Sequence, residues 1–191
     1  PCPGATPGEW MAEADYIVVG GGSAGCVVAA RLSENPHTSV LLLEAGGHDT
    51  HPLIGMPLGF LRTMTMPQFN WRYLTEPEPH LDGRRLPLPR GKVLGGSGSI
   101  NGMFAMRGHP ADYDQWAQMG ARGWSYADCL PYFRKLEDSW RGESLFHGTG
   151  GPVVIRPIDS PHVLHDVVMA TAANAGFATS EDLNGAVAEG F

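Results

Sequence analysis

The pattern of apolar positions is clearest at the start of the chain. Residues 15–19 (DYIVV) form a short apolar, β-branched run, which predicts a strand. The glycine-rich stretch 20–25 (GGGSAG) follows at once, and residues 26–32 (CVVAARL) have the composition of a helix. The order strand, glycine turn, helix is therefore predicted.

A second apolar run completes this first unit. Pro36 disfavours the helical conformation in Asn35, so the helix should end near residues 33–36. Residues 39–43 (SVLLL) then form another predicted strand, which ends in Glu44. A strand, a helix and a second strand of these lengths predict a βαβ unit with parallel strands.

No long periodicity is present between residues 46 and 90, where seven prolines interrupt the chain. An excursion of this length inside a compact domain is usually functional or wraps a ligand. We therefore expect a lid-like loop over residues 46–90.

Periodicity returns in the second half of the chain. Pro110 suits the first position of a helix over residues 111–119. Ser125 is a suitable N-cap for a helix over residues 126–137, which Pro131 should interrupt unless the helix starts later.

Residues 152–156 (PVVIR) predict a strand, and residues 161–175 predict a helix that ends at Gly176. The domain organisation expected from these patterns has three parts. Residues 1–14 form a disordered or tag-like terminus, residues 15–151 a nucleotide-binding domain, and residues 152–191 the incomplete start of a substrate domain.

Composition excludes several classes of protein. The chain has 191 residues, of which 42% are hydrophobic and 17% charged, as in ordinary globular domains. The net charge of −7, with only 13 Lys and Arg, argues against general affinity for nucleic acid. Three distant cysteines without CxxC spacing indicate neither a zinc site nor a disulfide framework.

No run approaches the roughly 18 apolar residues of a membrane helix, so we expect no transmembrane segment. The first ten residues lack the basic start and apolar centre of a signal peptide, which favours a cytoplasmic location.

The glycine turn carries the first candidate chemistry. Gly20, Gly22 and Gly25 fit the pattern GxGxxG, and Glu44 follows Gly20 by 24 residues. These glycines permit a tight turn, close approach of backbone to a pyrophosphate, and close packing of helix on strand; the acid suits a ribose. We predict dinucleotide binding, with either NAD or FAD. The alternative, a purely structural glycine turn, would not require the acid.

A second glycine-rich stretch, residues 90–102 (RGKVLGGSGSING), has five glycines and two serines in thirteen positions. The alternative here is a flexible linker, but linkers are usually polar throughout, and this stretch carries KVL and is followed by MF. Small residues at 95–98 would let the backbone approach a flat ring and a diphosphate, while Asn101 could hydrogen-bond the polar edge of a flavin.

Residues 91–114 (GKVLGGSGSINGMFAMRGHPADYD) resemble the first signature of the glucose-methanol-choline (GMC) family of FAD-dependent oxidoreductases. The resemblance extends over nearly the whole chain, through DYIVVGGGSAGCVVAARLSE, LLLEAGG, FNWRYLTEPEP, GRRLPLPRGKVLGG and MRGHPADYDQW. Bacterial choline- and alcohol-dehydrogenase-like members look most similar. The fold implied is α/β, a Rossmann-type FAD-binding domain followed by the beginning of an α+β substrate domain.

The resemblance also implies which residues contact FAD. For Trp71, in FNWRY, shielding of the cofactor and core packing are equally good interpretations. The cofactor-binding residues expected are Gly20, Gly22, Ser23, Ala24, Gly25, Glu44, Ala45, Trp71, Arg90, Val93, Gly95, Ser97, Asn101, Gly102 and Met103.

Two positions depart from the family pattern. Most relatives carry a serine where this chain has Gly98, which removes one hydroxyl. Some members, the choline oxidases among them, join FAD covalently to a histidine just before the asparagine, but this chain has Ile100 there. Isoleucine has no nucleophilic nitrogen, so we predict non-covalent FAD.

The resemblance implies oxidation of an alcohol to an aldehyde, with hydride transfer to flavin N5 and electrons passing to oxygen or another acceptor. The catalytic base and the second signature are expected in a C-terminal remainder, so no catalytic residue is assigned here and the chain alone should be inactive. Non-redox relatives, such as hydroxynitrile lyases and fatty-acid photodecarboxylases, and a non-catalytic fragment that binds FAD only with its C-terminal partner are the alternatives. His162 and His165 share a helix face, but two histidines without a third ligand do not predict a metal site.

Overall fold

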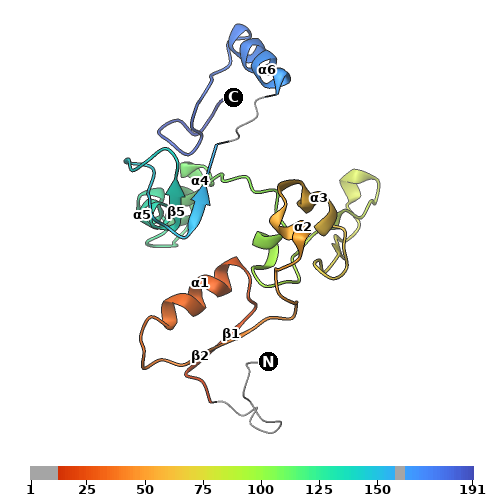
Figure 1. Ribbon diagram of the computed structural model, residues 1–191. Helices are drawn as coiled ribbons and strands as arrows, with labels where there is room; N and C mark the ends of the chain where they lie inside the picture. The colour runs from red at the N-terminus through yellow and green to blue at the C-terminus, as the bar shows by residue number, and fades with distance from the viewer. Residues whose placement is uncertain (1–12, 158–161) are drawn as a thin grey trace. The chain divides into compact units, whose positions relative to one another are not determined.

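The computed structural model describes residues 13–157 and 162–191 (Figure 1). Contacts divide the chain into two compact units, Pro1–Phe104 and Ala105–Phe191. The tag-like terminus expected for residues 1–14 lies almost entirely outside the described residues. The domain boundary expected near residue 152 stays a prediction.

Unit 1 begins with the βαβ motif expected from the sequence. Strands β1 (Tyr16–Val19) and β2 (Val40–Leu43) pair in parallel, with Tyr16 opposite Val40 and Val19 opposite Leu43. Helix α1 (Ser23–Leu32) connects them and packs along the strands (Figure 1). The helix starts three residues earlier than its apolar run, because Gly22 is the N-cap and residues 23–25 already form its first turn.

The excursion from 46 to 90 consists of short elements. They are the helical turns α2 (Pro52–Gly55), η1 (Pro57–Gly59), α3 (Phe60–Thr63) and η2 (Pro79–Leu81), and the antiparallel strands β3 (Tyr73–Leu74) and β4 (Pro87–Leu88). Prolines begin three of the four helical turns. Three of the seven prolines that interrupt the periodicity therefore start short helical turns, because proline is well suited to a first helical position.

The second glycine-rich stretch is integrated into unit 1 by backbone pairing. Isolated bridges join Gly22 to Gly95, Gly47 to Val93 and Asn70 to Gly91, and the short helix η3 (Gly96–Ser99) follows. A small core lies beneath this stretch. It comprises the buried residues Phe69, Val93 and Ile100, with Ile54, Met64 and Met66 packed against them.

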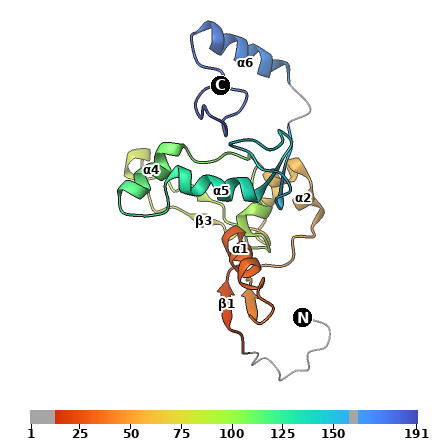
Figure 2. The same ribbon diagram turned by 90° about the vertical axis from the view of Figure 1, so that its left-hand side faces the viewer.

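Unit 2 holds two packed helices and a strand pair. Helices α4 (Pro110–Gln118) and α5 (Tyr126–Leu136) pack against each other (Figure 2). Strand β5 (Glu137–Ser139) pairs in parallel with β6 (Val153–Ile155), and α6 (Val163–Asn174) comes later. The predicted elements are therefore present, with ends shifted by one or two residues.

The expected interruption at Pro131 is wrong. Helix α5 starts at Tyr126 and runs through Pro131. Ser125 and Asp128 form a reciprocal capping box, in which each side chain pairs with the other residue's backbone N–H. This cap stabilises the first turn, while the proline removes only one hydrogen bond within the helix.

Among residues 13–157 and 162–191, none of the helices combines the length and apolarity that a membrane span requires.

Candidate functional site

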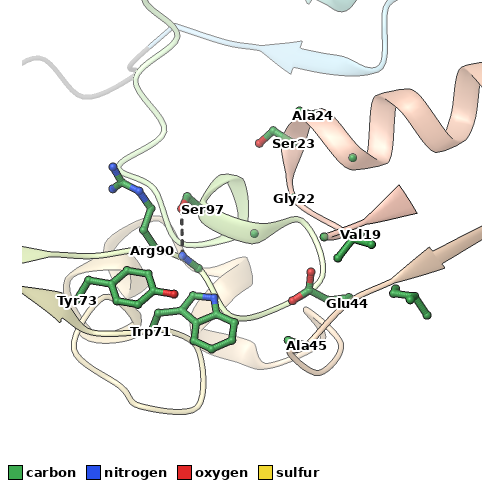
Figure 3. A pocket seen from close by; sticks show the side chains of 15 residues that line it. Val19, Gly22, Ser23, Ala24, Glu44, Ala45, Trp71, Tyr73, Arg90 and Ser97 are labelled. Atoms are coloured by element: carbon green, nitrogen blue, oxygen red, sulfur yellow. Dashed lines mark hydrogen bonds between the residues drawn. The ribbon is translucent and has the colours of Figure 1, made fainter. Parts of the chain in front are cut away.

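A cavity of about 800 Å³ opens in unit 1 beside the first turn of α1 (Figure 3). Its wall combines the ends of β1 and β2, the glycine turn, the aromatic residues of the 71–73 segment and the second glycine-rich stretch. The lining residues are Val19, Gly20, Gly22, Ser23, Ala24, Gly25, Leu43, Glu44, Ala45, Trp71, Tyr73, Arg90, Gly91, Gly96 and Ser97.

The N-terminus of α1 faces this cavity without a competing acceptor. The N-cap is Gly22, no side chain caps the helix, and no acidic residue lies in its first turn. Ser23, Ala24 and Gly25 of that turn line the cavity. The first N–H groups of a helix lack internal partners and carry partial positive charge, so they suit an anionic group such as a diphosphate.

The three glycines of GxGxxG meet three different steric conditions. Gly20 has a φ of +100°, which favours glycine. A Cβ on Gly25 would lie 1.9 Å from the carbonyl oxygen of Gly20, so only glycine lets the helix pack this closely. A Cβ on Gly22 would meet no atom closer than the Cα of Gly96 at 3.9 Å. The space that a side chain on Gly22 would occupy is therefore part of the cavity.

The Glu44 carboxylate lies at the edge of the cavity and is held by two backbone donors. Its Oε2 accepts from the N–H of Gly21 at 2.7 Å, and its Oε1 accepts from the N–H of Gly46 at 2.8 Å. Figure 3 shows the carboxylate pointing toward the glycine turn. Each carboxylate oxygen keeps a further lone pair, so Glu44 can still accept from ribose hydroxyls.

An aromatic pair forms another part of the cavity wall. The rings of Trp71 and Tyr73 are stacked, with centroids 6.0 Å apart and an interplanar angle of 3° (Figure 3). The ammonium of Lys92 lies 4.8 Å from the centroid of the Trp71 ring. Trp71 is 42% exposed and is not part of the small core of unit 1.

The second glycine-rich stretch contacts the first through backbone. The N–H of Gly95 donates to the carbonyl of Gly21 at 2.7 Å, and Gly96 has a φ of +58°. A Cβ on Gly96 would lie 2.8 Å from the Cα of Gly22. The hydroxyl of Ser97 accepts from the N–H of Gly91 at 3.0 Å. The stretch is therefore a fixed part of the wall, unlike a flexible linker.

Ten of the fifteen predicted cofactor-binding residues line the cavity, and five do not. The side chain of Val93 is fully buried in the core, so only its backbone is available to a cofactor, and the expectation that Val93 lies near FAD stays a prediction. Gly95 lies beside the cavity in the backbone bridge. Asn101 and Met103 line a separate cavity of about 210 Å³, and Gly102 lies between them in sequence.

Five lining residues were not among the fifteen predicted cofactor-binding residues, although Gly96 lies in the stretch 95–98 expected to approach the cofactor. Val19 and Leu43 are the last residues of β1 and β2, and Gly91 and Gly96 belong to the second glycine-rich stretch. Tyr73 is two residues from Trp71. Arg72 between them has a φ of +56°, so the segment is not an extended strand, and side-chain alternation gives no signal for Tyr73.

Two histidines have structural roles as helix caps. His109 and His162 are the N-caps of α4 and α6, and their Nδ1 atoms accept from the N–H groups of Ala111 and Leu164. Within the described part of the chain, no group of three or more His, Cys, Asp or Glu side chains is arranged to hold a metal.

Unit 2 contains a buried polar cluster outside the cavity. His147 bridges two carboxylates, with Nδ1 2.9 Å from Glu137 and Nε2 2.7 Å from Asp182. Arg107 lies 3.0 Å from the same Glu137 carboxylate. Burial acts to raise the pKa of Asp182, but the hydrogen bonds from His147 and the Asn184 backbone, with the charges of His147 and Arg141, lower that pKa overall.

Residues 14–191 match the N-terminal domain of the GMC oxidoreductases. The chain belongs to the GMC oxidoreductase family. It is 51% identical over 181 residues to an oxygen-dependent choline dehydrogenase from Sinorhizobium fredii, covering 94% of this chain and 33% of that protein. The GMC chain therefore spans about a third of the length of the curated relatives it matches.

Solved GMC structures are similar to this chain as well. A pyridoxine 4-oxidase from Mesorbium loti gives a TM-score of 0.84 at 38% identity, covering 90% of this chain and 34% of that one. A formate oxidase from Aspergillus oryzae RIB40, studied for modification of its FAD, gives 0.79 at 31%, covering 94% and 33%. These flavoproteins establish an FAD-binding α/β domain, and FAD is the cofactor of this GMC chain.

The cavity fits this cofactor on three observations. The uncapped first turn of α1 suits a diphosphate, Glu44 keeps acceptor capacity for ribose hydroxyls, and the space beside Gly22 is open to a ligand. The volume lies within the usual range for ligand sites, roughly 300–1,000 Å³.

Proposed function

We propose that this chain is the Rossmann-type, FAD-binding N-terminal part of an enzyme that oxidises an alcohol to an aldehyde. The observation that carries the proposal is the cavity in which an uncapped helix N-terminus, the Glu44 carboxylate and an aromatic wall converge. Choline and pyridoxine, named for two of the relatives, are both alcohols, which supports this substrate class.

Bound FAD supplies the acceptor for the hydride that leaves the alcohol carbon. The residues of this chain bind and orient the cofactor. The first turn of α1 holds the diphosphate through its free N–H groups, and Glu44 accepts from the ribose. Trp71 limits access of water to one side of the cavity. The base that removes the hydroxyl proton is expected in the remainder of the enzyme, beyond these 191 residues.

We further propose that FAD is held without a covalent bond. The residue before Asn101 is Ile100, which is 3% exposed and packs with Phe69 and Val93 in the core. Its side chain offers no nucleophile and faces apolar neighbours. Attachment through this position, as in some family members, is therefore not available to this chain.

An anaerobic reduction experiment tests the proposed function. The complete enzyme, loaded with FAD, is mixed with a panel of primary alcohols that includes choline and pyridoxine, and the visible absorbance of the oxidised flavin is followed. We expect at least one alcohol to bleach the flavin. If the enzyme binds FAD but no alcohol bleaches it, alcohol oxidation is wrong and a non-redox reaction takes its place.

A further inference from the structure

The side chain of Asn70 joins three segments of unit 1. Asn70 is only 5% exposed. Its Oδ1 accepts from the N–H of Arg72 and from the N–H of Arg90, both at 2.9 Å, and its Nδ2 donates to the carbonyl of Met64. A buried amide that satisfies three backbone groups fixes the relative positions of the segments that carry them.

The segment held by Asn70 carries the aromatic pair of the cavity. Arg72, between Trp71 and Tyr73, has a φ of +56°, a conformation that non-glycine residues adopt only at a cost. The hydrogen bond from the Arg72 N–H to Asn70 supports this conformation. The rings of Trp71 and Tyr73, on either side of Arg72, are stacked and both line the cavity.

The ring of Trp71 stacks with the Tyr73 ring and lies 4.8 Å from the Lys92 ammonium. Trp71 is 42% exposed, and β3, which follows it, pairs over only two residues with β4. The Trp71 N–H donates to the carbonyl of Arg90 at 2.9 Å, and the Arg90 N–H in turn donates to Asn70. The backbone position of Trp71 therefore depends on Asn70, and its ring orientation depends on Tyr73 together with Lys92.

We propose that Asn70 and Tyr73 are positioning residues that hold the Trp71 ring as a preformed wall of the FAD cavity. This inference rests on the proposed function, because it requires FAD in this cavity. Holding a half-exposed ring in its binding orientation before the ligand arrives reduces the entropy lost on binding. Asn70, being buried, acts on FAD only through the backbone that it holds, which carries Trp71 and Arg90.

A double-mutant cycle separates positioning from a general structural role. FAD dissociation constants are measured by flavin fluorescence for the complete enzyme, for Trp71→Ala, for Asn70→Ala, for Tyr73→Leu, and for each of the last two combined with Trp71→Ala. We expect each single substitution to weaken FAD binding about tenfold. Each double variant should bind no more weakly than Trp71→Ala alone, because the ring being positioned is already absent.

Asn35→Ala is the matched control. The Oδ1 of Asn35 accepts from the N–H of His37, two residues on, in the same way that Asn70 accepts from Arg72, but Asn35 is exposed and outside the cavity. We expect an unchanged dissociation constant. If Asn70→Ala does not fold, Tyr73→Leu carries the test, because Tyr73 is 50% exposed. Since Tyr73 itself lines the cavity, only a loss of affinity that disappears in the Trp71→Ala background counts as positioning.

The possible failures are distinguishable. If the unsubstituted enzyme does not bind FAD, the proposed function is wrong and this inference falls with it. If it binds FAD but Trp71→Ala binds equally well, or if Asn70→Ala and Tyr73→Leu weaken binding by the same factor with and without Trp71, the inference alone is wrong.

Discussion

Replacing Glu44 with glutamine tests whether this side chain shapes the FAD cavity as well as lining it. The carboxylate accepts one hydrogen bond on each oxygen, from Gly21 and from Gly46. An amide of the same size has a single acceptor oxygen, and its NH₂ group would face the other backbone N–H. One backbone donor would therefore lose its partner and meet a second donor.

The magnitude follows from that lost pairing. A part-buried donor left without an acceptor costs about 1–3 kcal/mol, which corresponds to a roughly 5- to 150-fold change in an equilibrium constant. Gly21 and Gly46 adjoin the lining residues Gly20, Gly22 and Ala45, so loss of one bond lets the wall shift, and we expect Glu44→Gln to weaken FAD binding by at most this range. The thermal midpoint of the FAD-free protein should fall too, because the lost bonds exist without FAD.

Flavin fluorescence titration gives the dissociation constant, and thermal unfolding without FAD gives the midpoint. Glu34→Gln is the control, since Glu34 is an exposed side chain paired with Arg31 on the surface of α1. Neither quantity should change for Glu34→Gln. Unchanged FAD affinity in Glu44→Gln would refute the argument. If FAD affinity falls but the thermal midpoint of the FAD-free protein does not, Glu44 contributes to binding through direct contact with the ribose and not by shaping the cavity.

Three further outcomes are expected. Gly25→Ala, whose Cβ would lie 1.9 Å from a carbonyl oxygen, should abolish measurable FAD binding, whereas Gly47→Ala, with no atom within 4 Å, should bind FAD normally in the same titration. Acid precipitation should release all flavin into the supernatant, because Ile100 offers no covalent anchor; flavin retained in the pellet would contradict this. The lowered pKa of Asp182 means that its ionised form contributes stability above the ordinary aspartate range, and that this contribution is lost as pH falls through the lowered pKa. The thermal midpoint of the unsubstituted protein should therefore fall more steeply with acidification than that of Asp182→Asn. Identical slopes would exclude the hydrogen bond between Asp182 and His147 as a source of pH-dependent stability.

Local patterns explain which parts of the fold were predictable from sequence. The βαβ motif, the N-cap Ser125 and the first-position Pro110 were predicted because neighbouring residues determine each of them. Pro131 was misjudged because the capping box that stabilises the helix competes with the cost of the proline, and sequence alone does not show which is larger.

The remaining features depend on contacts between distant residues. Asn70 gave no signal in the sequence, since its three partners lie 6 residues before it and 2 and 20 residues after it. The spacing after Gly20 predicted Glu44, and the family resemblance predicted most of the cavity wall, but the two backbone donors on Glu44 come from the three-dimensional structure. That the Val93 side chain is buried in the core also comes from the three-dimensional structure.

The backbone bridge between Gly22 and Gly95 has a consequence for how the protein folds. It joins residues more than seventy positions apart, so closing it costs more chain entropy than forming the local contacts of the βαβ motif. The nucleotide site should then be among the last parts of unit 1 to assemble. A ligand that binds only the closed form shifts the folding equilibrium by about 2.7 kcal/mol at a hundredfold excess over its dissociation constant. Supply of FAD during synthesis would therefore govern how much of the protein reaches its native state.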